Sequence, residues 1–123
     1  MDAAQALGEL RELSSQITAA VVLDADGAVL ASSPDGSTSL ADATRQLAAA
    51  AADLGSDGRD VTRVEVELDE GAIFVVREGE YTVAATTGPS PTSGLVVYDL
   101  RTCAQAIAPP KKSRARKQKE PTE

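Results

Sequence analysis

Apolar residues near the start of the chain recur at the spacing of an amphipathic helix. They stand four, three and four residues apart, which predicts a helix over about 3–16. The stripe consists of Ala6, Leu10, Leu13 and Ile17. Asp2 precedes Gln5 by three residues, the spacing of a capping box, so the helix is expected to begin beside it.

A β-branched run then replaces the helical spacing. Residues 17–24 and 28–33 are rich in Val, Leu and Ala, and they flank the sequence DADG at 24–27. A glycine in this place adopts a positive φ at little cost, which is typical of a tight turn. The segment 17–33 is therefore predicted to be a β-hairpin.

A second helical pattern covers about 40–54. Ser39 precedes Asp42 by three residues and suggests another capping box, and Gly55 is a suitable C-terminal stop. Residues 48–52 are all alanine, which gives a surface that another helix can approach closely. The apolar face consists of Leu40, Leu47, Ala51 and Leu54.

From about residue 61 the apolar residues recur at every second position. Val64, Val66 and Leu68 alternate with charged residues, which indicates a half-exposed strand over about 61–69. Two further strands, at 72–78 and 81–87, follow after short Gly-containing turns, so the three form a meander.

A third helix is predicted over about 93–107, with one apolar stripe made of Val96, Leu100, Cys103 and Ile107. The predicted order is α-β-β-α-β-β-β-α. This order predicts an α+β fold, in which helices pack on one five-stranded antiparallel sheet.

Charge divides the chain into two parts. Residues 108–123 hold six Lys and Arg residues against two acids, a net charge of +4. The other 107 residues hold six Arg residues against seventeen acids, a net charge of −11, which is unsuited to binding a phosphate backbone. We therefore expect one domain over 1–107 and a disordered basic tail over 108–123.

The chain lacks the residues from which most catalytic and metal sites are built. It has no His and a single cysteine, Cys103, which we expect to be a buried structural thiol. The acids Asp24 and Asp26 lack the remaining ligands of a calcium loop, and no phosphate-binding glycine motif occurs. The sequence thus predicts a protein that is not an enzyme and binds no cofactor or metal.

The tail is the most ambiguous segment. Its basic residues, within 111–119, would suit nucleic acid, an anionic membrane, an acidic partner or the chain's own acidic body. A merely solvated end is the favoured interpretation. No apolar run approaches the roughly 18 residues of a membrane helix, and the N-terminus does not resemble a secretory signal, so we expect a cytoplasmic protein.

Four stretches together resemble the roadblock (dynein light chain) family, and they span about 3–107. They are VVLDADGAVLAS (21–32), SLADATRQLAAAAADLG (39–55), RVEVELDEGAIFVVREGEYTVAATT (63–87) and SGLVVYDLRTCAQAI (93–107). The resemblance implies a profilin-like roadblock fold. It also implies a non-enzymatic dimer that binds or regulates a Ras-like small GTPase or serves as a scaffold, with bacterial members among its relatives.

Two physical features fit dimerisation. The helix 40–54 has more small apolar surface than one core stripe needs, and the strand 61–69 would be an exposed edge in a monomer. We therefore predict an isologous homodimer. The expected contacts are Leu40, Thr44, Leu47, Ala48, Ala51, Arg63, Glu65 and Glu67.

A small-ligand sensor of PAS or GAF plan is the alternative, because those domains also pack helices on a five-stranded antiparallel sheet. Such sensors usually enclose a cavity lined by aromatic and polar groups. Aromatic residues make up only 2% of this chain, which disfavours that function.

Overall fold

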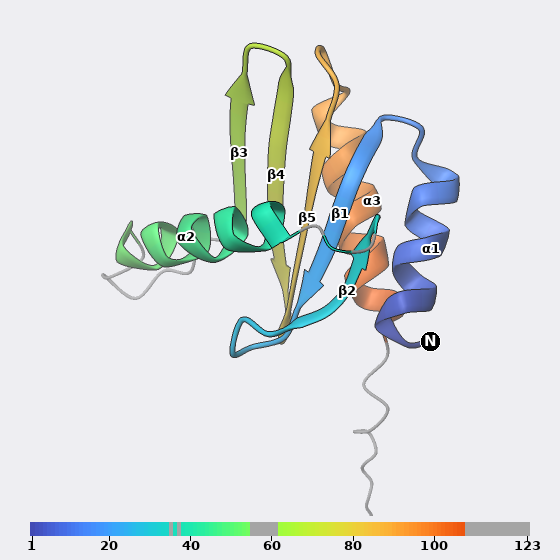
Figure 1. The fold of residues 1–123 in the computed structure, drawn as a ribbon, viewed down its shortest axis with the longest axis vertical. Coiled ribbons are helices and arrows are strands. Elements are labelled where there is room, and N and C mark those ends of the chain that lie inside the picture. Colours follow the sequence, from blue (N-terminus) through green and yellow to red (C-terminus); the bar gives the residue numbers. More distant parts are fainter. Residues whose placement is uncertain (35, 37, 55–61, 108–123) are drawn as a thin grey trace, which may run out of the picture.

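The computed structural model describes residues 1–34, 36, 38–54 and 62–107 (Figure 1). The elements follow the predicted order α-β-β-α-β-β-β-α. They are α1 (Ala3–Leu13), β1 (Ile17–Leu23), β2 (Val29–Ser33), α2 (Thr38–Leu54), β3 (Arg63–Leu68), β4 (Gly71–Glu78), β5 (Tyr81–Thr87) and α3 (Ser93–Ala106). The predicted stop at Gly55 and the predicted tail 108–123 lie outside the described residues.

The five strands form one antiparallel sheet in the order β2-β1-β5-β4-β3, so β2 and β3 are its two edges. Helices α1 and α3 cover one face, and α2 crosses the other face at a steep angle to the strands (Figure 1). The predicted fold class, an α+β protein with a five-stranded antiparallel sheet, is confirmed.

The core is divided unequally between the two faces. Alternate residues of the central strands, such as Phe74, Val76 and Val83, are fully buried beneath α1 and α3. The face beneath α2 has a smaller buried cluster that includes Val21, Val75 and Leu40. The predicted α3 stripe is confirmed, since all four of its residues are buried. A single helix covers less of a sheet than two helices do, which leaves part of the α2 face exposed.

Helix α1 begins as predicted but ends earlier. The Gln5 amide donates to Asp2 Oδ1 at 2.8 Å and the Asp2 amide donates to Gln5 Oε1 at 3.2 Å, which confirms the capping box. The predicted extension to residue 16 is wrong, because the chain leaves the helix at Ser14 and enters β1 at Ile17. Leu13 is 77% exposed, so the buried stripe consists of Ala6, Leu7 and Leu10.

Helix α2 begins before the predicted cap. Gly36 has a φ of 82°, and its carbonyl accepts from the Thr38 amide at 2.7 Å. The helix starts at Thr38, so Ser39 lies inside its first turn instead of capping it. Leu54 was predicted on the core side, but its side chain is 78% exposed at the far end of the helix.

The turn between β1 and β2 has the predicted form. Gly27 has a φ of 87°, and Asp24 Oδ1 accepts from the amides of Asp26 at 2.9 Å and Ala28 at 3.0 Å. The Asp24 carboxylate is thus used by the turn itself, which is how Asp commonly stabilises such a turn.

Candidate association surface

No catalytic constellation is found among the described residues. They contain no cluster of three or more side chains that could ligate a metal ion, and no helix among them is long and apolar enough to cross a membrane. Cys103 lies buried on α3, as predicted, and burial raises the pKa of its thiol to about 11. The thiol therefore stays protonated at neutral pH, and a thiol in that state is a poor nucleophile. The surface features that remain are suited to binding.

The outer edge of β3 is regular. It pairs with β4 in unbroken register from Arg63 opposite Val76 to Leu68 opposite Gly71. The Arg77 amide donates to the Thr62 carbonyl at 2.9 Å, which identifies this residue pair as a hydrogen-bonded one. Because such pairs alternate along antiparallel strands, every second residue of β3 turns its backbone groups away from β4. The outward-directed amides and carbonyls belong to Arg63, Glu65 and Glu67.

The side chains of β3 alternate between the two faces of the sheet. Val64 packs with the cluster beneath α2, so Val66 and Leu68 lie on that same face. Glu65 lies on the opposite face, where its Oε2 accepts a hydrogen bond from the Ser93 hydroxyl on α3 at 2.9 Å. Arg63 and Glu67 share the Glu65 face, and Arg63 contacts Glu65 Oε1 at 3.5 Å. The edge therefore has an apolar side and a charged side.

Helix α2 is longer than the part of the sheet that it crosses. It has 17 residues, and at 1.5 Å per residue its length is about 25 Å. It contacts β1, β5, β4 and β3, whose three spacings of about 4.8 Å amount to roughly 14 Å. The C-terminal half of α2 accordingly projects past β3, as Figure 1 shows.

The two flanks of α2 differ. Residues directed at the sheet, Leu40, Ala41, Thr44 and Ala51, are buried. At 100° per residue, one flank carries Arg45 and Ala48, and the other carries the stripe Ala43, Leu47, Ala50 and Leu54. Leu47 packs against the same buried cluster as Val64 and Ile73, and the stripe lies on the flank opposite Arg45, toward the half of the sheet that α2 leaves uncovered.

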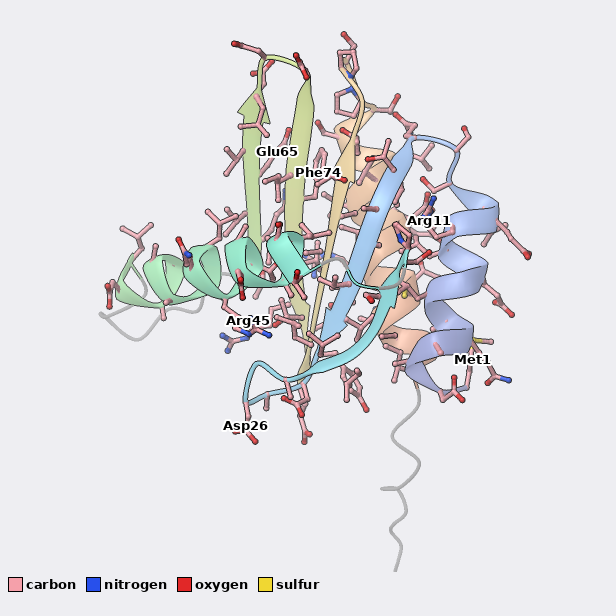
Figure 2. All side chains as sticks on the ribbon, viewed as in Figure 1. Met1, Arg11, Asp26, Arg45, Glu65 and Phe74 are labelled. Carbon is pink, nitrogen blue, oxygen red and sulfur yellow. The ribbon has the colours of Figure 1, made fainter. Side chains whose placement is uncertain are left out.

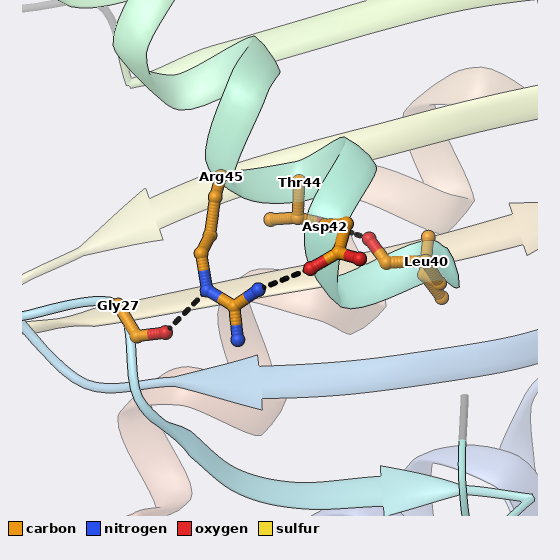
Figure 3. A network of polar contacts seen from close by, with 5 residues as sticks. All are labelled: Gly27, Leu40, Asp42, Thr44 and Arg45. Carbon is orange, nitrogen blue, oxygen red and sulfur yellow. Dashed lines mark hydrogen bonds and ion pairs between the residues drawn. The ribbon is translucent and has the colours of Figure 1, made fainter. Parts of the chain in front are cut away.

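Arg45 fixes the first flank in place. Its Nε donates to the Gly27 carbonyl at 2.8 Å and its Nη1 donates to Asp42 at 2.6 Å (Figure 3). Figure 2 shows Arg45 reaching from α2 toward the β1–β2 turn at Asp26. A cleft of about 450 Å³ lies here, lined by Arg45, Ala48 and Arg77 among others, with no aromatic ring. The arginine on this flank is therefore already bonded to groups of its own chain.

The second flank and the α2 face of the sheet beside it both carry apolar residues, and we call this set of residues the open apolar surface. It includes two strongly exposed leucines, Leu54 at 78% and Leu68 at 51%. Exposed leucines near an unpaired strand are a common sign of an association surface. The surface consists of Ala43, Leu47, Ala50, Leu54, Val66, Leu68 and Ile73.

The structure separates the residues that the sequence grouped as dimer contacts. Leu40, Thr44 and Ala51 are already buried within the chain, and Thr44 is 0% exposed with its hydroxyl donating to the Leu40 carbonyl at 2.7 Å. Ala48 lines the cleft on the other flank. The remaining predicted contacts lie on the open side of the molecule, and they are Leu47, Arg63, Glu65 and Glu67.

Four residues of the open apolar surface were not among the contacts expected from the sequence: Ala43, Ala50, Leu54 and Ile73. The alternation along 64–68 already indicated an apolar strand face. The sequence did not show which parts of the helix and of that strand face the fold leaves uncovered.

An antiparallel sheet that is closed by helices on one face and keeps one regular edge free defines a class of domain suited to pairing with another sheet. The family model of the Roadblock/LC7 domain matches residues 4–87, and the chain belongs to this family. No curated protein matches the sequence at a significant level.

Solved structures share the fold of this chain. A Roadblock/LC7 domain from Streptomyces avermitilis is 25% identical, with a TM-score of 0.72 over 92% of this chain and 100% of that one. The gliding protein MglB from Thermus thermophilus is 19% identical, with a TM-score of 0.70 over 86% of this chain and 85% of that one. MglB from Myxococcus xanthus is 15% identical, with a TM-score of 0.64 over 85% and 87%.

Proposed function

We propose that this protein is a non-enzymatic homodimeric adaptor of the cytoplasm that binds and regulates a Ras-like small GTPase. The observation that carries the proposal is the combination of a regular free β3 edge with the open apolar surface beside it. An unpaired edge invites another strand, and an adjacent apolar patch favours a partner that also covers that patch.

A second copy of the chain meets both needs. Two β3 edges related by a two-fold axis would join two five-stranded sheets into one continuous sheet. The projecting end of each α2 would then lie over the uncovered half of the partner's sheet. Leu54 and Ala50 would bury their exposed surface against the partner's open apolar surface. Such contacts are isologous, so the assembly closes at two copies.

The GTPase partner is supported by family membership and by likeness in fold to proteins named MglB. Three of the six arginines in residues 1–107, Arg11, Arg45 and Arg101, are held by hydrogen bonds to their own chain. An arginine finger must reach freely into a neighbouring active site, which disfavours these three in that role. We propose that the protein acts by docking against the GTPase and positioning the GTPase's own residues.

Two measurements test the proposal. Sedimentation velocity at micromolar concentration is expected to show a dimer, and a monomer only would overturn the dimeric part. Immobilised full-length protein is expected to retain a Ras-like GTPase of the same genome loaded with GDP or a GTP analogue. Failure to retain any such GTPase in either nucleotide state, with the dimer intact, would overturn the GTPase part alone.

The basic tail is not needed for this function, and 108–123 is proposed to be a solvated end. Deleting 109–123 should leave dimer formation unchanged. Salt-dependent binding to DNA or to anionic vesicles that disappears with the deletion would assign the tail a separate role.

A further inference from the structure

The backbone of β3 restricts how two copies can pair. Because the outward hydrogen-bonding groups belong to Arg63, Glu65 and Glu67, only these residues can bond across the edge. A two-fold axis perpendicular to the sheet also keeps each face continuous, so opposed residues must lie on the same face of the sheet, which excludes registers that lie between residues. Among the remaining registers, only an axis through residue 64, 65 or 66 lets at least two of the outward-facing residues pair within β3.

We propose that the two-fold axis passes through Glu65, so that Arg63 of one chain lies directly opposite the partner's Glu67. The proposal rests on the homodimer proposed above and specifies its interface. The proposed partner of the β3 edge is thus a second copy of this chain, paired in one defined register.

Charge selects this register among the three. With the axis at 65, two Arg–Glu pairs form, and one Glu–Glu pair lies on the axis. With the axis at 66, Glu65 would face the partner's Glu67 twice, and directly opposed like charges destabilise a sheet. With the axis at 64, each Arg63 would face the partner's Glu65, but Glu67 would have to pair beyond the N-terminal end of β3.

Hydrogen bonding favours the same register. An axis at 65 lets all three outward-facing residues pair within β3, which forms six inter-chain backbone hydrogen bonds by the alternation of antiparallel ladders. On the apolar face, Val64 lies opposite the partner's Val66 on both sides of the axis. The Glu65 carboxylate on the axis is partly compensated by the Ser93 hydroxyl, which donates to it at 2.9 Å.

Disulfide cross-linking of single cysteines placed along β3 would show the register directly. A residue on the axis lies about 5.5 Å from its own copy, Cα to Cα, within disulfide range, whereas its neighbours on β3 lie about 8 Å from theirs. Glu65→Cys is therefore expected to cross-link the dimer under mild oxidation, while Val64→Cys and Val66→Cys do not. The native Cys103 is buried and protonated, so the unmodified protein is the matched control.

Charge reversal supplies an independent test. Arg63→Glu and Glu67→Arg each replace two attractive pairs by two repulsive ones, and each is expected to weaken dimerisation roughly tenfold. The double variant R63E/E67R recreates the two pairs in reverse and should restore the wild-type dissociation constant. In a register centred on 64 it would not, because the glutamate introduced at position 63 would still oppose the partner's Glu65.

The outcomes separate this inference from the proposed function. A dimer that cross-links through Val64→Cys or Val66→Cys, or that the double charge reversal does not rescue, overturns the register and leaves the dimer standing. A protein that sediments as a monomer overturns the dimer itself. Cross-linking at residue 65 together with rescue by the double reversal supports both. Circular dichroism of each variant verifies that the domain is folded before its dimerisation is compared.

Discussion

The two edge strands of the sheet, β2 and β3, differ in how readily they can pair with a strand of another chain. Strand β2 has an extra residue at Leu30, because its register with β1 shifts between the pairs Val22–Ala31 and Leu23–Val29. Arg11 Nη1 also donates to the Ser33 carbonyl at 3.0 Å and to its hydroxyl at 2.9 Å. Strand β3 has an unbroken register, and no described side chain bonds to its outer backbone groups.

This difference explains why association would stop at two copies. A bulge and a side chain bonded to the backbone both discourage strand addition, so β2 is a protected edge. If both edges were open, copies could add to each side of the sheet without limit. With only β3 open, pairing two copies uses the available edge on both chains. The protected β2 edge therefore limits the assembly that forms through β3 to two copies.

A proline at the centre of β3 is expected to have the largest effect. Glu65→Pro removes an outward amide without removing a hydrogen bond to β4, so the monomer should fold and the dimer should be lost. Sedimentation velocity and thermal unfolding measure the two properties. Glu65→Ala keeps the amide and serves as the control, which should dimerise at least as well as the wild type. A dimer retained by the proline variant would contradict an open β3 edge.

The two flanks of α2 offer the next test. Ala50→Arg places a charge in the open apolar surface and should weaken dimerisation by tens of fold, because the guanidinium would have to be buried against the partner. Ala49→Arg places the same group at an exposed position on the other side of the helix and should leave the dimer unchanged. Dissociation constants from sedimentation equilibrium compare the two. Equal effects would mean that the wrong flank has been assigned.

Opening the protected edge should have a smaller effect. Arg11→Met removes both hydrogen bonds to Ser33. It is expected to reduce the free energy of unfolding by about 1 kcal/mol and Tm by roughly 5 °C. Light scattering should also show association beyond the dimer at high concentration. Arg101→Met, which loses an arginine bonded to Glu78 on β4, is the matched control and should remain a dimer.

The smallest expected effect is a difference in thiol reactivity between the buried Cys103 and a cysteine placed on the open apolar surface. Burial raises the pKa of Cys103 to about 11, so its thiol should react slowly with a disulfide reagent at pH 8. Leu54→Cys, in a Cys103→Ala background, should react quickly at low protein concentration and slowly once the dimer forms. A reaction rate independent of concentration would remove Leu54 from the interface.

The same shift has a consequence for stability at alkaline pH. The pKa of Cys103 is higher in the folded chain than its ordinary value of 9.0, so the folded state binds the proton more tightly. The contribution of this residue to stability should be constant below pH 9 and should decrease as the pH rises toward about 11. Chemical unfolding of wild type and Cys103→Ala across this range measures it as a difference between the two proteins.

Local patterns sufficed to predict the element order and much of the core. The alternation along 64–68, the apolar stripe of α3 and the DADG turn at 24–27 each appear in the structure as expected. These features depend on neighbours within a few residues, which a sequence displays directly. The errors arose at ends of elements. Leu13 continued the α1 stripe in the sequence, but the chain had to leave the helix there to enter β1.

The sequence by itself determined which surfaces are apolar, which residues alternate along the strands, and how the charges Arg63, Glu65 and Glu67 are ordered on one strand face. The tertiary structure confirmed that β3 is an edge strand, and it alone decided that α2 projects past it and which flank of α2 stays uncovered. Periodicity determines which residues share a face. What covers that face depends on segments distant in the chain, because exposure is a property of the packed whole.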